Sequence, residues 1–526
     1  MHDRHLKGDA AAASASGLTN DGSRGQVRGS ALLVLGRVIA LALGMVTQVI
    51  IVRTLTKADF GAFAYALAIA SGARILLSLG QGRLLSRFMA TYEEQRDYAR
   101  MFGAMFLAVG TIAVTSVLSI GALFLFSDEL IGSAVDSDDA VRLVLILILL
   151  SPLEALDQVF VSLFAVFSKP RSIFFRKHLL GPGLRLVVVL CLVVAGASVE
   201  FLAVGYVLAA VAGVALYCGL LVTVLRERGL LQELRPRQIV VPFRAVFAFS
   251  FPLITGELAL LSMTVGGVIV LGWYHSTVEV ADFRAVFSAA RLNTAITASF
   301  STLFLPAIAR LFERGDIDGL RRTYWHTATF VAVFTFPIFA VTGPLAPLTT
   351  ELLFGERYAG SATVLAWLAI GYYVNVMLGF NAYALQVCGR LRFVVGVNVF
   401  TALFNIGLCV LLAPPYAAVG VAAANCLALV GQNLLNQWGM RRDLRSRFID
   451  RQCRAAYATI VLCAGALWAF QVLVDPGLVT GALAVAATSA IVVFFSRRAL
   501  QLVDTFPELA RIPVVGRLLR EPRDAR

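Results

Sequence analysis

Charged side chains interrupt several long apolar runs of this 526-residue sequence. The basic ones are Arg37, Arg74, Arg185 and Arg291, and the acidic ones are Glu154, Asp157 and Glu257. A charge at the centre of a membrane-spanning helix costs about 2.5–3.5 kcal/mol on insertion scales, so it normally faces a wet cavity or a partner. The planar fork of arginine can bind two phosphate oxygens at once. The pattern predicts either ion pairs that lock helices together or a basic cavity that accepts an anionic headgroup.

Acidic and amide side chains add two further possibilities. Glu154 and Asp157 are three residues apart and therefore share one face of a helix, where they either bind a coupling cation or neutralise an arginine. Glu257 is a third candidate for the coupling ion. Amides in the second half of the chain indicate interhelical hydrogen bonds or recognition of sugar hydroxyls, with Asn375 and Asn398 as substrate-binding candidates. The other amides of this group are Asn293, Asn381, Asn405 and Asn425.

The motifs of several enzyme classes are absent from the sequence. No lysine closes a GxxxxGK[ST] phosphate loop, and neither HExxH nor GxSxG occurs. The seven cysteines form no CxxC pair, which favours inert thiols over a disulfide or zinc framework. We therefore expect no catalytic residue, no metal and no cofactor, and a protein that is not an enzyme.

Composition places the chain in a membrane. It is 59% hydrophobic and 15% charged, with a mean hydropathy of +0.81. Soluble domains carry about 45–50% apolar and about 25% charged residues, so a secreted, cytosolic or nucleic-acid-binding protein is excluded. Apolar runs predict an all-α multi-pass membrane protein with about 14 transmembrane helices, because a helix needs about 20 apolar residues to cross a bilayer. The spans are expected near 31–52, 60–80, 101–126, 141–167, 179–197, 201–225, 245–273, 285–307, 326–343, 361–385, 393–413, 417–439, 455–474 and 478–496.

Basic residues predict the orientation of these spans. With the N-terminus in the cytoplasm, most of the 45 Lys and Arg residues fall in cytoplasmic segments, among them 169–177. The outer loops hold only Arg53, Lys57, Arg284 and Arg357. The net charge of +13 is thus a topology signal that also suits contact with anionic membrane lipids, and both termini are expected in the cytoplasm.

A weak internal repeat suggests two related halves. The triplet Ala-Asp-Phe at 58–60 opens the second expected span, and the same triplet at 281–283 opens the eighth. Both spans end in an apolar, then basic, then acidic exit, LSRFMATYEEQR at 85–96 and LPAIARLFERGD at 305–316. An even number of spans separates the copies, which predicts two six-helix lobes in parallel pseudo-repeat plus two C-terminal helices. Arg74 and Arg291 occupy the matching spans and favour the cavity interpretation.

The expected organisation follows from these boundaries. Two six-helix lobes are joined by an interlobe linker, two more helices follow, and cytoplasmic tails lie at both ends. The segments are a disordered tail at 1–29, the N-terminal lobe at 30–225, the linker at 226–244, the C-terminal lobe at 245–440, helices 13 and 14 at 441–496, and a tail at 497–526.

From about residue 27 to 496 the chain resembles the Wzx-type polysaccharide flippases of the multidrug/oligosaccharidyl-lipid/polysaccharide exporter superfamily. The resemblance is carried by VRTLTKADFGAFAYALAIA (52–70), LSRFMATYEE (85–94), ELLFGERYAGSATVLAWLAIG (351–371) and the stretch from 384 to 430. Within these, Phe354, Gly355 and Tyr358 form a Phe-Gly-x-x-Tyr step, and Gly389 and Arg390 form a turn ahead of Asn398.

The resemblance implies a transporter for surface polysaccharide biosynthesis, such as exopolysaccharide or lipopolysaccharide. It would move a polyprenyl-diphosphate-linked oligosaccharide across the bacterial cytoplasmic (inner) membrane by alternating access, with a cationic cavity to which Arg37, Arg74 and Arg291 contribute. The implied partners are this lipid-linked oligosaccharide and membrane lipids, with a polysaccharide polymerase and chain-length machinery as further partners that the resemblance allows, and no nucleic acid. The alternatives are a multidrug/cation antiporter of the same superfamily and a peptidoglycan lipid-precursor flippase.

Overall fold

The computed structural model describes residues 35–78, 81–125, 138–167, 174–233, 238–243, 256–257, 259–443 and 449–500. Within these ranges the chain is all-α and contains no strand, as the sequence predicts. Eleven of the described helices are long and apolar enough to cross a membrane. The expected tail at 1–29, residues 234–237 and 244 of the expected linker, and residues 501–526 of the expected C-terminal tail lie outside the described residues.

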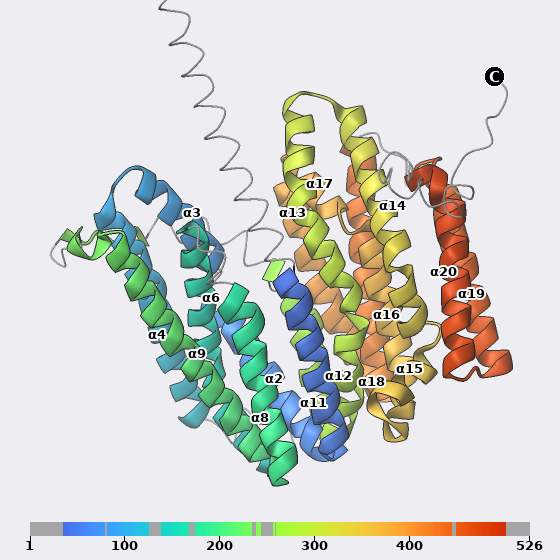
Figure 1. The fold of residues 1–526 in the computed structure, drawn as a ribbon, viewed down its shortest axis with the longest axis horizontal. Coiled ribbons are helices and arrows are strands. Elements are labelled where there is room, and N and C mark those ends of the chain that lie inside the picture. The colour runs from blue at the N-terminus through green and yellow to red at the C-terminus, as the bar shows by residue number, and fades with distance from the viewer. Residues whose placement is uncertain are drawn as a thin grey trace, which may run out of the picture. The chain divides into compact units, whose positions relative to one another are not determined.

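Contacts group the chain into two compact units. Unit 1 comprises Met1–Thr47, Leu76–Gly121 and Leu149–Ser250, and unit 2 comprises Gln48–Ile75, Ala122–Ile148 and Phe251–Arg526. Helix Leu35–Thr54 and α2 (Lys57–Ser78) each begin in one unit and end in the other. The elements are labelled in Figure 1.

Unit 1 is built from apolar helices that bury one stripe each and leave the rest exposed. On α4 the buried residues include Met101, Ala104, Ala108 and Ile112, spaced three or four apart. Val117 on the same helix is 72% exposed, as expected for a side chain that faces lipid. The helices of unit 1 are α3 (Gln81–Glu94), α4 (Tyr98–Leu125), α6 (Leu150–Val166), η2 (Phe174–Leu180), α8 (Gly181–Ala195), α9 (Val199–Glu227) and η3 (Leu230–Glu233).

A π-helical turn, η2, carries a basic side chain into the interior of unit 1. Arg176 is 6% exposed, and its Nη2 donates to Asp157 Oδ1 of α6 at 2.8 Å while its Nε donates to Gly213 O of α9 at 3.1 Å. The guanidinium lies 5.0 Å from the centre of the Tyr217 ring. Residues 169–177 are predicted as a cytoplasmic loop, but 174–180 form the π-helix η2, from which Arg176 reaches Asp157.

Unit 2 holds the remaining helices, which include the antiparallel pair α19 and α20 at the red end of Figure 1. Buried aromatic residues such as Tyr324, Trp325 and Phe380 belong to one of its core clusters. The elements are α5 (Asp138–Leu147), η5 (Ser262–Gly266), α11 (Gly267–Tyr274), α12 (Thr277–Ala290), α13 (Leu292–Glu313), α14 (Ile317–Thr342), α15 (Ala346–Phe354), η6 (Glu356–Ser361), α16 (Ala362–Leu378), α17 (Asn381–Val387), α18 (Leu391–Asp443), α19 (Arg454–Val474) and α20 (Leu478–Leu500).

The segment α18 consists of two helices that meet at Ala417, and it contains two of the expected spans, 393–413 and 417–439. Its backbone leaves the helical region at Ala417, where φ is 46° and ψ is −130°, directly after Pro414 and Pro415. Proline removes a backbone donor and clashes with the preceding turn, which explains the kink. Of the seventh expected span, 245–255 and 258 lie outside the described residues, and the remainder contains the apolar helix Ala259–Tyr274. The eighth expected span, 285–307, covers the end of α12, Arg291 and most of α13.

We predict that Gly213→Val destabilises unit 1. A Cβ at Gly213 would lie 1.7 Å from Arg176 Nη2, so the guanidinium would have to leave Asp157. Breaking a buried ion pair costs roughly 3 kcal/mol, which should lower both the thermal unfolding midpoint of the detergent-purified protein and its level in membranes. Gly219→Val is the matched control on the same helix, because nothing lies within 4 Å of its Cβ position. Equal unfolding midpoints for the two variants would contradict this account of Arg176.

Candidate functional site

The candidate site lies at the break between α12 and α13, where a single residue separates the two helices. α12 ends at Ala290, α13 begins at Leu292, and Arg291 stands between them with φ −87° and ψ −2°. The carbonyl oxygen of Arg291 accepts from Thr294 N at 3.0 Å and from Thr294 Oγ1 at 2.7 Å. A broken helix presents unbonded N–H groups and a positive dipole end at its new N-terminus, which favours an anion there.

Two arginines gather at this break. Arg284 and Arg291 are seven residues apart and so lie on one face of the α12 region. Phe287 lies between them, with its ring centre 5.3 Å from the Arg284 guanidinium and 5.4 Å from that of Arg291. Tyr372 of α16 lies 5.8 Å from the Arg291 guanidinium. The two positive charges are close enough to repel one another.

Neither of these arginines has an acidic partner within 4.0 Å in the described part of the chain. A cation over an aromatic ring gains about 0.5–2 kcal/mol. That is less than the roughly 2.5–3.5 kcal/mol cost of placing one such charge in the membrane interior. The α12–α13 break therefore keeps an excess of positive charge.

Asn293 follows the break and is fully buried. In the part of the chain that the structure describes, neither its amide nitrogen nor its amide oxygen has a hydrogen-bond partner. Leaving a buried polar group unpaired costs about 1–3 kcal/mol, so this amide is suited to bond to a polar ligand.

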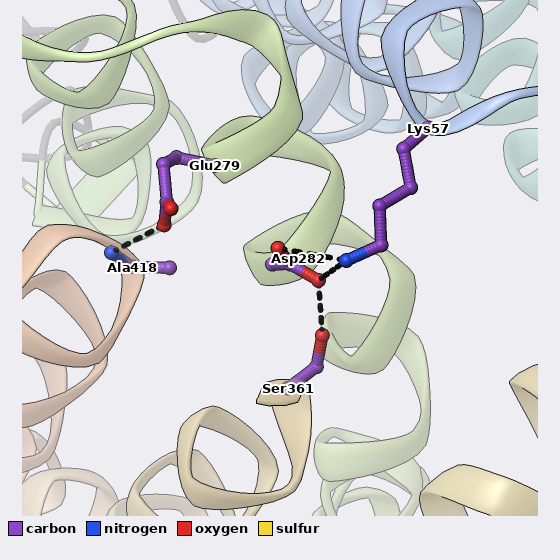
Figure 2. A network of polar contacts seen from close by, with 5 residues as sticks. All are labelled: Lys57, Glu279, Asp282, Ser361 and Ala418. Atoms are coloured by element: carbon purple, nitrogen blue, oxygen red, sulfur yellow. Dashed lines mark hydrogen bonds and ion pairs between the residues drawn. The ribbon is translucent and has the colours of Figure 1, made fainter. Parts of the chain in front are cut away.

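The first turns of α12 are anchored to three other elements, as Figure 2 shows. Lys57 Nζ on α2 donates to Asp282 Oδ1 at 2.8 Å, and Ser361 Oγ donates to the same oxygen at 2.7 Å. Glu279 Oε2 accepts from Ala418 N, beside the kink of α18, at 3.3 Å. The side chains of Lys57 and Asp282 are 26% and 16% exposed, so this ion pair is largely shielded from solvent. These contacts fix the helix that carries Arg284 and Arg291.

Ion pairs account for two of the acids and one of the arginines singled out by the sequence. Arg185 Nη2 donates to Glu154 Oε1 at 2.8 Å, and the Arg185 guanidinium lies 5.4 Å from the Tyr206 ring centre. Asp157 bonds to Arg176, as described above. Glu154 and Asp157 thus share a helix face, as expected, and each of them faces an arginine.

The other predicted charges are separated. Arg37 lies half-buried on helix Leu35–Thr54 in unit 1, near His178. Arg74 is half-buried near the end of α2 and belongs to the same compact unit as Arg291. Glu257 is half-buried and follows Gly256, whose Cβ position lies 3.6 Å from Asn398 Nδ2.

Apart from Asn293, the predicted amides form amide contacts among α16, α17 and α18. Asn375 Oδ1 accepts from Asn433 Nδ2 at 3.0 Å, and Asn398 Oδ1 accepts from Gln432 Nε2 at 3.1 Å. Asn381 Nδ2 donates to Asn433 O at 3.1 Å, and Asn405 Nδ2 donates to Asn425 Oδ1 at 2.9 Å. These bonds match the interhelical role that the sequence allowed for this group.

Sequence reasoning missed Arg284, Arg176 and the partner amides Gln432 and Asn433. Arg284 is expected in an outer loop. Its spacing of seven residues from Arg291, which corresponds to about two helical turns, is a signal that could have placed both on one helix face. Arg176 is expected in a cytoplasmic loop, and nothing local indicates that it turns inward. Gln432 and Asn433 are adjacent in the expected span 417–439, and their spacing gives no signal of a site.

The structure resembles solved transporters at low sequence identity. It matches the lipid II flippase MurJ, in an inward closed conformation, with a TM-score of 0.70 and 14% identity over 91% of this chain and 99% of that chain. It matches an inward-facing MATE family multidrug resistance transporter of the MOP superfamily with a TM-score of 0.63 and 14% identity over 78% of this chain and 99% of that chain. None of the curated proteins compared matches this chain.

A family comparison covers more than half of the sequence. The profile of polysaccharide biosynthesis proteins matches residues 26–312, a range that includes α2, α12 and the break at Arg291. The sequence match and the structural likeness to MurJ and MATE transporters therefore agree for this all-α, multi-pass membrane protein. The chain belongs to the family of polysaccharide biosynthesis proteins and has the fold of MOP superfamily transporters.

Proposed function

We propose that the protein is a membrane transporter, a flippase that moves a polyprenyl-diphosphate-linked oligosaccharide across the bacterial cytoplasmic membrane for surface polysaccharide biosynthesis. The observation that carries the proposal is the pair Arg284 and Arg291 at the α12–α13 break, which has no acidic partner among the described residues. A diphosphate offers two negative groups in a row, and two guanidiniums on one helix face suit it.

The membership of the family and the fold support this choice of substrate class. The family consists of polysaccharide biosynthesis proteins, and MurJ, whose solved structure has the same fold, is a lipid II flippase. Lipid-linked saccharides combine a charged headgroup with an oily chain, so the headgroup needs a polar route while the chain stays in lipid. Positive charge that is held inside a membrane protein without a counter-ion provides such a route.

The proposed architecture has two six-helix lobes, 30–225 and 245–440, around a cationic central cavity that opens alternately to each side. Arg37, Arg74 and Arg185 are the further arginines proposed to line it, with Asn375 and Asn398 for sugar hydroxyls. Both termini are proposed to be cytoplasmic, and a polysaccharide polymerase with its chain-length machinery is the proposed recipient of the product. Exopolysaccharide and lipopolysaccharide are both products that this role would serve.

Coupling to an ion is proposed to involve an acid of the set Glu154, Asp157 and Glu257. A cation at Glu154 or Asp157 would have to displace Arg185 or Arg176, because each carboxylate already accepts from a guanidinium at 2.8 Å. Glu257 adjoins the amide pair Asn398 and Gln432 through Gly256, which supplies neutral oxygen ligands nearby.

A peptidoglycan lipid-precursor flippase is the second candidate, since MurJ has the highest TM-score of the structures described above. Its substrate carries the same diphosphate and would use the same arginines. A multidrug/cation antiporter fits less well, because it calls for uncompensated acids and the excess charge at the helix break is positive.

We predict that Arg291→Ala and Arg74→Ala each reduce surface polysaccharide by more than about tenfold at unchanged protein level, because a lost charge-assisted contact to phosphate is worth roughly 1.5–3 kcal/mol. Arg291→Lys should retain part of the activity, since lysine keeps the charge but loses the two-pronged geometry. Arg322→Ala, which removes an exposed arginine at the start of α14, is the control. Normal polymer from both alanine variants would remove the arginine site from the mechanism.

We predict that Asp282→Asn lowers surface polysaccharide by roughly three- to tenfold, because it removes the charge that holds Lys57 and so loosens α12. The exchange of Lys57→Asp with Asp282→Lys should recover most of the loss. Asp318→Asn, at an exposed ion pair with Arg321, should have no effect. A double exchange as inactive as Asp282→Asn alone would contradict an anchoring role for the pair.

We predict that the purified protein does not consume nucleotide sugars when supplied with a polyprenyl phosphate or diphosphate acceptor. A membrane glycosyltransferase, the rival of another class, would release the nucleotide. The measurement is the nucleotide product by chromatography, with a known glycosyltransferase as the positive control. Detectable, protein-dependent release would support the enzyme and oppose the flippase.

A further inference from the structure

A cavity of about 550 Å³ lies in unit 2, away from the α12–α13 break, where the end of helix Leu35–Thr54, α15 and the α19–α20 connection meet. Its charged lining residues are Arg53, Glu351 and Asp475, and its apolar ones include Leu348, Pro476 and Leu478. A volume of this size is typical of small-ligand sites, which range from about 300 to 1,000 Å³. None of these residues takes part in the function proposed above.

The cavity holds one cation against two anions. Arg53 donates from Nε to Leu353 O at 2.9 Å and from Nη2 to Leu352 O, so it caps the C-terminal end of α15. Those two bonds use only part of its five N–H donors. Asp475 Oδ1 accepts from Gln471 Nε2 at 2.9 Å. Glu351 is exposed, and within the described chain its carboxylate makes no hydrogen bond.

The depth of the cavity relative to the bilayer follows from α19. This helix has 21 residues. At about 1.5 Å per residue it spans roughly 31 Å, close to the ~30 Å hydrocarbon core of a bilayer. Leu473, Val474 and Leu478 around the α19–α20 turn are 82%, 60% and 56% exposed, as suits contact with acyl chains. Asp475, which directly follows Val474, therefore lies at the level of lipid headgroups.

The opposite end of α19 is basic. Arg451 and Arg454 lie at its start, and Arg441 and Arg442 lie at the end of the preceding helix. By the positive-inside rule that end faces the cytoplasm, which leaves the cavity on the outer side. An occupant must then come from the outer leaflet or from solution next to it.

We propose that this cavity binds the headgroup of a zwitterionic phospholipid that carries a primary ammonium beside its phosphate, as ethanolamine phospholipids do. The ammonium donates to Glu351 and Asp475, and the phosphate accepts from the remaining N–H groups of Arg53. A choline headgroup has no N–H to donate, and an anionic glycerol headgroup meets two carboxylates. A divalent metal is a poorer occupant, because the described residues contain no group of three or more possible metal ligands among His, Cys, Asp and Glu.

The first test uses the wild-type protein, purified in detergent and incubated with lipids of identical acyl chains. Native mass spectrometry should show retention of phosphatidylethanolamine over phosphatidylcholine and phosphatidylglycerol by about tenfold, as expected for charge-assisted hydrogen bonds. Stepwise methylation of the amine should reduce retention at each step, because each methyl group removes one donor. Equal retention of the ethanolamine and choline lipids would overturn the proposal.

The second test uses Glu351→Gln combined with Asp475→Asn. Asparagine tolerates the left-handed backbone of Asp475, where φ is 47°, so the turn between α19 and α20 should be kept. The double variant should lose the preference for ethanolamine, whereas Glu356→Gln, an exposed acid outside the cavity, should keep it. A double variant with the wild-type preference would also overturn the proposal.

Soluble glycerophosphoethanolamine distinguishes the source of the headgroup. Competition by this compound only at far higher concentration than the lipid supports a membrane lipid as the occupant. Competition at equal concentration would mean that the acyl chains add nothing, and the lipid assignment would be wrong. Each of these readouts is binding, so the outcome is separate from that of the transport experiments.

Discussion

The cost of holding a charge in a medium of low dielectric constant governs this structure. Each charged side chain within an apolar helix must find a partner, a polar surface or a ligand, because water is not at hand to solvate it. Unit 1 meets the requirement with ion pairs. Arg176 and Asp157, and Arg185 and Glu154, join helices that are otherwise held by non-directional apolar contacts. Tyr217 and Tyr206 cover the two guanidiniums.

Unit 2 meets the same requirement differently at the α12–α13 break. Arg284 and Arg291 have aromatic rings rather than carboxylates beside them, and the repulsion between them remains. The acids of α12 are used elsewhere, since Glu279 bonds to the backbone at the α18 kink and Asp282 bonds to Lys57 and Ser361. Helix α12 therefore carries acidic residues in its first turns, where they anchor it to other elements. Its basic residues lie towards the break, where they have no acidic partner among the described residues.

Unpaired backbone groups follow the same rule as charges. The kink of α18 frees the amide of Ala418, which finds Glu279, and the end of α15 frees carbonyls that accept from Arg53. At both places a side chain from another element satisfies the freed backbone groups, as irregular backbone in a membrane protein requires. The places where helices break or end are accordingly the places where polar side chains converge, and both proposed binding sites lie at such places.

The all-helical, multi-pass fold could be predicted from the sequence, although about 14 spans were expected and 11 described helices are long and apolar enough to cross a membrane. In lipid a helix satisfies its own backbone hydrogen bonds, so a local run of apolar residues is enough to specify a span. Hydropathy also predicted separate spans at 393–413 and 417–439, and the backbone does leave the helical region at Ala417, where the two helices of α18 meet. The hydrogen bond from Asn405 Nδ2 to Asn425 Oδ1 at 2.9 Å shows that these two helices lie side by side. The arginines inside apolar runs were likewise recognisable as costly, and Glu154 and Asp157, which were expected on one helix face, each bond to an arginine.

Which charge meets which was decided only by the tertiary structure. Lys57 and Asp282 are 225 residues apart, and no local pattern links them. Arg176 lies in a π-helix and points into unit 1, where the small Gly213 on another helix leaves it room. Arg284 was expected in a loop, yet α12 extends past it and ends at Ala290. Local sequence determines where a helix forms, because its hydrogen bonds are local, whereas a side chain's partner depends on how distant helices pack.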